Sequence, residues 1–133
     1  KPTYQFATER PYWEQIERSL DRVYQNGGDA TLSVLRPALA FTNTLSMTAL
    51  PGRKKKKELT KFIDPKDELR EWWEPGDEPF RGFERFGDDD WDARTVCTDV
   101  SVAKQIFKDM FVHGELTESS FVQMRSNWSP KPR

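Results

Sequence analysis

The stretch from Phe86 to Leu116 constrains the fold of this chain most, because three different signals follow one another in it without a break. An acidic segment, Asp88 to Asp92, comes first and predicts an exposed loop. A short apolar run from Thr95 to Thr98 follows, and its composition favours a buried strand. An amphipathic helix then begins near Asp99, which suits an N-cap, and ends at Gly114, which suits a C-terminal cap. The acidic loop is the part of this stretch that we expect to be functional.

The first third of the chain predicts a second helix and a β-hairpin. Apolar residues recur at helical spacing from Pro11 to Gln25, and the two glycines after Asn26 end this helix. Apolar and polar residues alternate from Thr31 to Leu35 and again from Asn43 to Leu50, as in half-buried strands. Because Pro51-Gly52 is a turn signal, we expect a return strand within Arg53 to Ile63.

The predicted return strand contains four consecutive lysines, Lys54 to Lys57, which cannot all face a core. We therefore expect this strand to lie at a sheet edge, where lysine discourages pairing with other chains, or its hairpin tip to project into water. A nucleic-acid surface combines lysines with arginines and stacking aromatics, and only Arg53 adjoins this run. Nucleic acid is therefore not favoured as a partner.

The segment from Asp64 to Asp92 is acidic and rich in proline and glycine. It holds twelve Asp or Glu against four Lys or Arg, a local balance of −8. A helical turn is expected around Lys66 to Trp73 and a long connection after it. Aromatic rings in the connection argue against disorder, because such rings order a loop by packing. After Leu116 we expect a short helix capped by Thr117, with Phe121 and Met124 facing inward, Trp128 closing over the core and residues 129–133 forming a flexible tail.

The 133 residues fit one domain, and the order of elements predicts an α+β fold with a small antiparallel sheet packed against two main helices. The single cysteine, Cys97, excludes an internal disulfide and fits a reducing compartment. No apolar run is long enough to cross a bilayer, and no signal peptide is recognisable. We expect a cytoplasmic protein with no membrane partner.

Catalytic constellations are absent from the sequence. It has one histidine, His113, which is expected to cap the C-terminal end of a helix, and Cys97 lies in an apolar run typical of a core. No phosphate-binding, nucleophile-elbow or zinc-protease motif occurs. We therefore expect a protein that is not an enzyme and that carries no cofactor and no metal.

Two carboxylate chemistries remain as alternatives. A carboxylate-based enzyme or a sugar-binding domain could use the acidic residues near Trp72 and Trp73, which are Glu68, Glu71, Glu74, Asp77 and Glu78. Asp88, Asp90 and Asp92 match the first alternating ligands of a calcium loop. The pattern then fails, because Ala93 stands where glycine is needed and Asp99 where glutamate is needed.

Three segments of the chain resemble bacterial immunity proteins of polymorphic toxin systems. They are Asp90-Trp91-Asp92-Ala93-Arg94, Asp99-Val100-Ser101-Val102-Ala103, and the run from Phe107 to Leu116. The layout is also similar over Trp13 to Trp128, although the lysine run departs from it. The resemblance implies a small α+β protein, encoded beside a toxin, that inhibits the toxin by binding it.

Many toxins of such systems are nucleases with cationic substrate grooves, so the resemblance implies an acidic surface that occupies a groove of this kind. The tract carries aromatic and charged residues of the types found at interface hot spots. The residues expected to contact the partner are Asp88, Asp89, Asp90 and Asp92 for charge and Trp91 as an anchor, with Glu74, Asp77 and Glu78 as secondary contacts. The sequence identifies neither the partner nor the oligomeric state.

Overall fold

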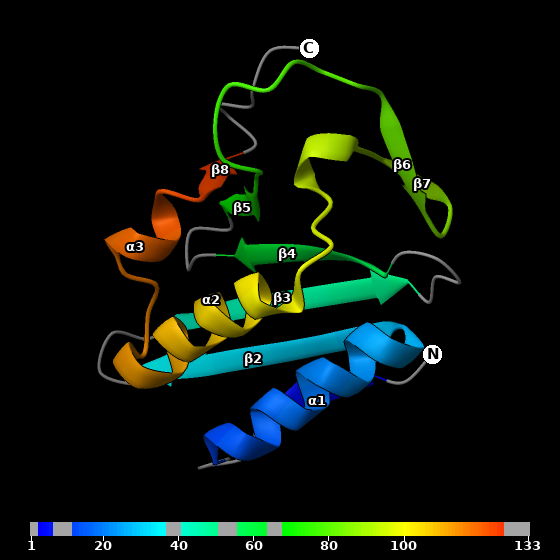
Figure 1. The fold of residues 1–133 in the computed structure, drawn as a ribbon. Helices are drawn as coiled ribbons and strands as arrows, with labels where there is room; N and C mark the ends of the chain where they lie inside the picture. The colour runs from blue at the N-terminus through cyan, green and yellow to red at the C-terminus, as the bar shows by residue number, and fades with distance from the viewer. Residues whose placement is uncertain (1–2, 7–11, 37–40, 51–55, 64–67, 127–133) are drawn as a thin grey trace.

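The computed structural model describes residues 3–6, 12–36, 41–50, 56–63 and 68–126, with the side chains of 3–6, 35–36 and 41–42 excepted (Figure 1). Its elements in chain order are β1 (Thr3–Phe6), α1 (Trp13–Asn26), β2 (Gly28–Arg36), β3 (Phe41–Leu50), β4 (Lys57–Ile63), β5 (Leu69–Trp72), β6 (Phe83–Phe86), β7 (Asp89–Asp92), the 3-10 helix η2 (Ala93–Thr95), α2 (Val100–His113), α3 (Glu118–Phe121) and β8 (Met124–Ser126). The predicted α+β class is confirmed.

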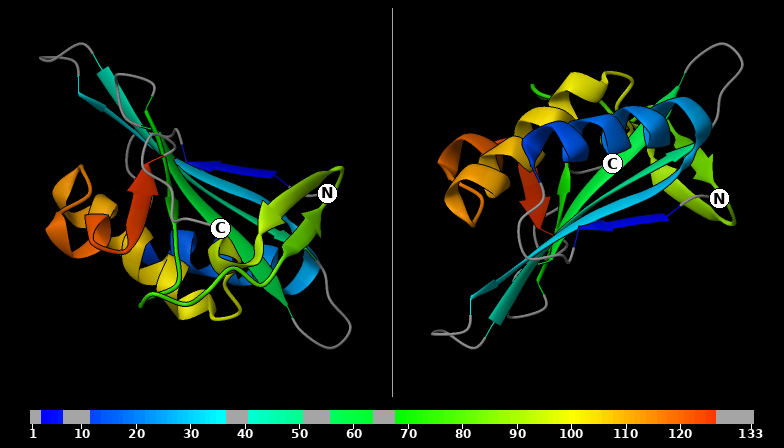
Figure 2. Two further views of the ribbon diagram at one scale, coloured as in Figure 1. Left: turned by 90° about the horizontal axis from the view of Figure 1, so that it is seen from above. Right: turned by 90° about the horizontal axis from the view of Figure 1, so that it is seen from below.

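Six strands form one sheet in the order β1-β2-β3-β4-β5-β8, and β6 pairs with β7 in a separate hairpin. The strands from β2 to β8 are all antiparallel to their neighbours, whereas β1 runs parallel to β2 at one edge. The helices α1 and α2 cover one face of the sheet, and the β6–β7 hairpin lies on the other side (Figure 2).

The main core lies between the two helices and the sheet. Leu45, Met47 and Ala49 of β3 point into it, while Thr44, Ser46 and Thr48 face away, so the predicted alternation is confirmed. Further fully buried apolar side chains of this core come from both helices and from β2, among them Ile16, Leu20, Val23, Ala30, Ala103, Ile106, Phe107 and Met110.

The two long helices run antiparallel. The ring of Trp13, at the start of α1, packs 5.8 Å from that of Phe111 near the end of α2. At the opposite end, Lys104 of α2 lies 2.8 Å from Asp21 of α1. The hydroxyl of Tyr24 donates to the carbonyl oxygen of Thr98 at 2.6 Å, which ties the last turn of α1 to the residues that precede α2.

The predicted helix boundaries are close to those observed. Asp99 caps α2, because its carboxylate accepts from the Ser101 backbone N–H at 3.0 Å. Gly114 ends this helix at φ +75°, a backbone conformation that side chains with a Cβ rarely adopt. Gly27 follows the last residue of α1, and Thr117 stands at the N-cap position of α3 as expected.

Three expectations from the sequence are wrong, and one of two alternatives is excluded. Leu69–Trp72 is a strand rather than a helical turn, since it completes the sheet between β4 and β8. Asp89–Asp92 is a strand rather than a loop. The run from Thr95 to Thr98 is not a strand, because Thr95 closes a 3-10 turn and only Cys97 forms an isolated bridge. Of the two alternatives for the lysine-bearing strand, the edge position is excluded, because β4 lies between β3 and β5 in the sheet.

The predicted hairpin from Asn43 to Ile63 is confirmed by the pairing of β3 with β4. Lys54 and Lys55 at its tip lie outside the described residues, as do Trp128 and the expected tail at 129–133.

Candidate functional site

The acidic segment of the sequence forms one strand of the β6–β7 hairpin. Phe83 pairs with Asp92 at its open end and Phe86 with Asp89 at its closed end. Gly87 in the connecting turn has φ +62°, so the turn needs a residue without a Cβ penalty at this position. Asp88, Asp89 and Asp90 are all exposed, and we call these three residues the acidic turn.

Two lysines of β4 attach the hairpin to the sheet. The Nζ of Lys57 lies 2.6 Å from Oε2 of Glu84 in β6. The Nζ of Lys61 lies 3.8 Å from the centre of the Trp91 ring in β7, a cation–π contact. Burial lowers the pKa of Lys61, although three nearby carboxylates oppose this shift. The part of the lysine-rich strand that the structure describes therefore holds the acidic hairpin in place.

A buried arginine anchors the base of the hairpin. The guanidinium of Arg94, only 2% exposed, donates from Nε to Oδ1 and from Nη2 to Oδ2 of Asp92 at 3.0 and 2.8 Å. Its Nη1 donates to the carbonyl oxygen of Glu78 at 3.2 Å, and the rings of Trp73 and Phe80 lie 5.1 and 5.6 Å away. The hydrogen bonds that Arg94 donates to Asp92 raise the pKa of Arg94. Asp92 thus has an internal ion pair, which fixes the chain where it leaves β7.

The structure divides the predicted contact residues into three groups. Asp88 and Asp89 are exposed, and Asp90 forms an exposed pair with Arg85 at 3.4 Å. Trp91 and Asp92 are turned toward Lys61 and Arg94, so they position the hairpin. The secondary residues Glu74, Asp77 and Glu78 lie on the connection between β5 and β6, before the hairpin.

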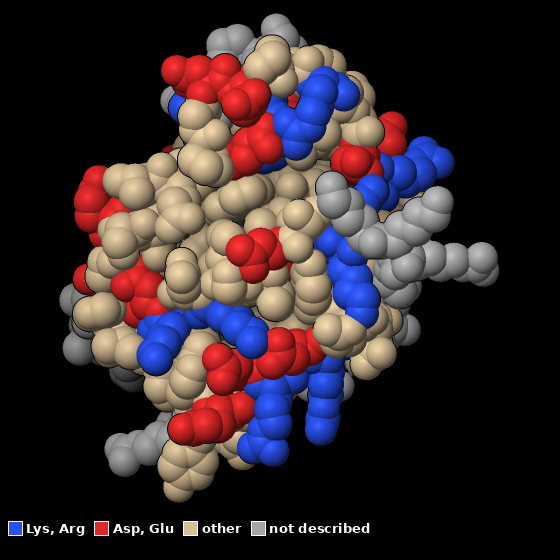
Figure 3. Space-filling model, viewed as in Figure 1, with Lys and Arg blue, Asp and Glu red and all other residues tan. Residues whose placement is uncertain are grey.

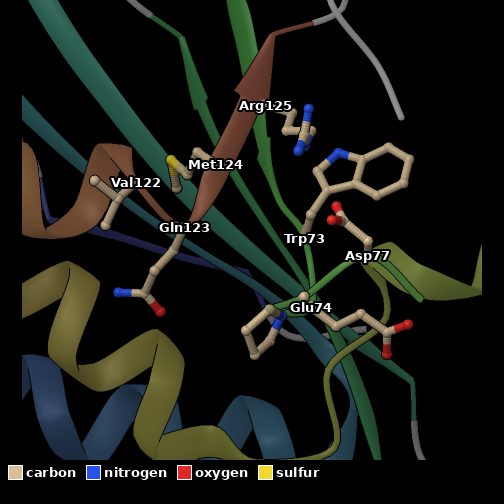
Figure 4. Close-up of a pocket in the computed structure, with 9 residues that line it drawn as sticks. Trp73, Glu74, Asp77, Val122, Gln123, Met124 and Arg125 are labelled. Carbon is tan, nitrogen blue, oxygen red and sulfur yellow. The ribbon is translucent and has the colours of Figure 1, made fainter. Parts of the chain in front are cut away.

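A pocket of about 350 Å³ opens between this connection and the segment that joins α3 to β8 (Figure 4). We call it the β5–β8 pocket. It is lined by Trp73, Glu74, Pro75, Gly76, Asp77, Val122, Gln123, Met124 and Arg125. It brings two of the predicted site residues, Glu74 and Asp77, to one place.

The pocket does not offer a pair of free carboxylates. Both oxygens of Glu74 accept from the guanidinium of Arg81. Trp73 is 8% exposed and lies beside Arg94, so little of its ring face is open to a sugar. Both features count against the acid–base pair and the stacking surface that a glycoside-cleaving or sugar-binding domain needs.

A cysteine–histidine dyad is excluded by distance. Cys97 precedes α2 and His113 ends it, so about 20 Å of helix separates them. Burial raises the pKa of the Cys97 thiol to about 12, which makes this cysteine a poor nucleophile at neutral pH. At the helix end, the Nδ1–H of His113 donates to the Asp109 carbonyl oxygen at 2.9 Å.

The buried acid Glu58 was not among the residues predicted to be functional. Glu58 is 0% exposed, on the core side of β4, and neither of its carboxylate oxygens has a hydrogen-bond partner among the described residues. Burial, together with the negative charge of Asp99, raises the pKa of Glu58 to about 8. Alternation along the strand could have suggested an inward position for Glu58, but the neighbouring lysines obscured the pattern.

On the face seen in Figure 3, acidic side chains lie in small groups, several of which have Lys or Arg beside them. Within the described residues, no three His, Cys, Asp or Glu side chains are grouped to hold a metal ion. No described helix has the length and apolar character needed to span a membrane. Comparison of the chain with protein-family models, curated proteins and solved structures found no match.

Proposed function

We propose that this protein is a non-enzymatic inhibitor, an immunity protein that binds and neutralises a basic toxin domain through the β6–β7 hairpin. The observation that carries the proposal is the acidic turn. It places three exposed aspartates at the tip of the hairpin. Contacts of Lys57 and Lys61 attach this hairpin to the sheet, and the Arg94–Asp92 pair fixes its base.

Attachment of the hairpin matters because a fixed surface loses less conformational entropy on binding than a mobile loop. The contacts of Lys57, Lys61 and Arg94 are made by side chains at the base and along the strands, which leaves the acidic turn itself uncovered. Asp88 and Asp89 have no ion-pair partner among the described residues, and Asp90 beside them is paired only with the exposed Arg85. Like charges held close together in this way make the local potential more negative and speed the encounter with a cationic partner.

The hairpin also offers an apolar contact beside its charges. Phe83 is 49% exposed, and its ring packs edge-on against Phe80 at 5.2 Å. An exposed ring next to charged residues has the composition of an interface hot spot. In the proposed complex the aspartates occupy a cationic groove of the toxin, as substrate phosphates would, and Phe83 packs against its rim. The toxin would act in the cytoplasm, so this function places the protein there.

The test uses the product of the neighbouring reading frame as the partner. Association is measured for the wild type and for Asp88→Lys/Asp89→Lys at about 0.05 M and about 0.5 M salt. We expect the double reversal to slow association at low salt by tenfold or more, and to have a smaller effect at high salt, because salt screens exposed charges.

The matched control is Glu14→Lys/Glu118→Lys, which makes the same change in net charge at exposed positions of α1 and α3. It should leave association within about twofold of the wild type. Equal losses in the two double variants would show that only net charge matters, and they would contradict a site at the hairpin. A neighbouring gene that encodes a metabolic enzyme would count against the immunity function itself.

A further inference from the structure

The β5–β8 pocket lies apart from the acidic turn and has two charged side chains of opposite sign in its lining. Asp77 and Arg125 are both exposed, and both line the pocket. Neither makes a side-chain hydrogen bond or an ion pair with any described residue, and the two do not pair with each other.

This lack of pairing contrasts with the surrounding charges. Glu74 is held by Arg81, and Asp92 is held by Arg94. On the strand next to β8, Arg70 lies 3.5 Å from Glu68. Asp77 and Arg125 thus bring an unpaired acid and an unpaired base to the lining of one pocket, where a ligand with both charges could satisfy them together.

The rest of the lining is largely apolar. Its apolar members are the buried Trp73 and Met124 and the exposed Pro75 and Val122. In the view of Figure 4 the indole of Trp73 lies between the carboxylate of Asp77 and the guanidinium of Arg125. A pocket of this kind, apolar with a few polar groups that fix orientation, is typical of small-molecule sites, and its volume is at the lower end of their range.

We propose that the β5–β8 pocket binds a zwitterionic small molecule of amino-acid size. The ligand's ammonium group lies at Asp77, and its carboxylate lies at Arg125, whose planar guanidinium can donate two parallel hydrogen bonds. An apolar ligand side chain packs against the apolar part of the lining. A purely cationic ligand is repelled by Arg125 and a purely anionic one by Asp77, so the two residues select for a ligand that carries both charges.

The experiment titrates the protein alone with three probes of one shape: L-leucine, L-leucinamide, which lacks the carboxylate, and N-acetyl-L-leucine, which lacks the ammonium group. Binding is followed by the shift of the Trp73 indole Nε1–H resonance. We expect a saturable shift with L-leucine in the millimolar range and affinities about tenfold lower for each analogue, because each has lost one charge-assisted contact.

Two variants assign the charges. In Asp77→Asn, L-leucine and N-acetyl-L-leucine should bind alike, because the group that recognises the ammonium is gone. In Arg125→Gln, L-leucine and L-leucinamide should bind alike. Asp88→Asn at the acidic turn should bind all three probes as the wild type does. Each variant is thus expected to abolish discrimination of one charged group only, and general damage to the fold would not produce this pattern.

A Trp73 resonance that does not shift, or that shifts equally with all three probes in the wild type, would overturn the proposal. Since no toxin is present in the titration and the hairpin variant serves as its control, the outcome is independent of whether the proposed inhibitory function is correct.

Discussion

Glu58 and Cys97 face each other across an antiparallel bridge and exchange both backbone hydrogen bonds, at 2.8 and 2.9 Å. This bridge joins the middle of the sheet to the segment between the acidic hairpin and α2. It also fixes the backbone where the Glu58 side chain enters the core, so the fold holds an acid in an environment that favours its neutral form.

The first prediction is that Glu58 makes stability depend on pH. Its folded-state pKa of about 8 lies above the ordinary value of 4.5, so the folded state retains a proton that the unfolded state releases. The favourable contribution of this proton is complete below about pH 4.5 and is lost as the pH rises through 8, with a slope of up to about 1.4 kcal/mol per pH unit.

Glu58→Gln should flatten this dependence and be more stable than the wild type at pH 8, because the amide has no proton to lose. Urea unfolding at pH 5, 6, 7 and 8 measures both proteins. If the free energies of unfolding of the two proteins changed in parallel with pH, the pKa of Glu58 would not differ between the folded and unfolded states.

The second prediction separates the two roles of the hairpin aspartates. Asp92→Asn removes the charge that compensates buried Arg94, whereas Asp88→Asn changes only an exposed carboxylate. We expect a clearly lower urea midpoint for Asp92→Asn and a change within about 0.5 kcal/mol for Asp88→Asn. Equal midpoints would mean that the ion pair does not hold the base of the hairpin.

The third prediction concerns how firmly the hairpin is attached. Trp91→Ala removes the ring under the Lys61 ammonium and leaves every charge in place. Backbone amides of β6 and β7 should then exchange about tenfold faster, as expected for a loss of roughly 1.4 kcal/mol, while those of α2 keep their rates. Exchange that speeds up throughout the molecule would instead indicate a general loss of stability.

The fourth prediction concerns Asp109, which links α2 to α3. Its carboxylate accepts from the backbone N–H and hydroxyl of Thr117, both at 2.8 Å, and from the Ser120 hydroxyl at 2.7 Å. Burial alone would raise the pKa of Asp109, but these donors and nearby His113 outweigh it and lower the pKa. The stabilisation is therefore present above the ordinary pKa of about 3.8 and lost as the pH falls below it.

Asp109→Ala should reduce the free energy of unfolding by about 2 kcal/mol at neutral pH. The control is Glu118→Ala, an exposed acid close by on α3, which should have a small effect. Loss of equal size in both variants would contradict a specific role for the Asp109 carboxylate.

The helices were the most predictable part of the fold. Their apolar stripes, the N-cap at Asp99 and the glycines at positions 27 and 114 are local signals, and a helix makes its backbone hydrogen bonds within one segment. The alternation along β3 was equally clear, because one face of that strand contacts the core and the other does not. The short strands β5, β6, β7 and β8 were missed, since three or four residues carry too little pattern to reveal a distant pairing partner.

The candidate site, like the fold, was predictable only in part. The sequence by itself determined that an acidic, aromatic tract exists, that the chain lacks a recognisable catalytic motif and that two amphipathic helices are available for a core. Only the tertiary structure decided which charges are open to solvent. Asp92 faces Arg94, Glu74 faces Arg81 and Lys57 faces Glu84, whereas Asp77, Asp88 and Asp89 have no ion-pair partner among the described residues. The physical reason is that a sequence does not show which way a side chain points. Asp92–Arg94 and Glu74–Arg81 are close in sequence but meet only because of the backbone path, and Lys57–Glu84 meets only because β4 packs beside β6.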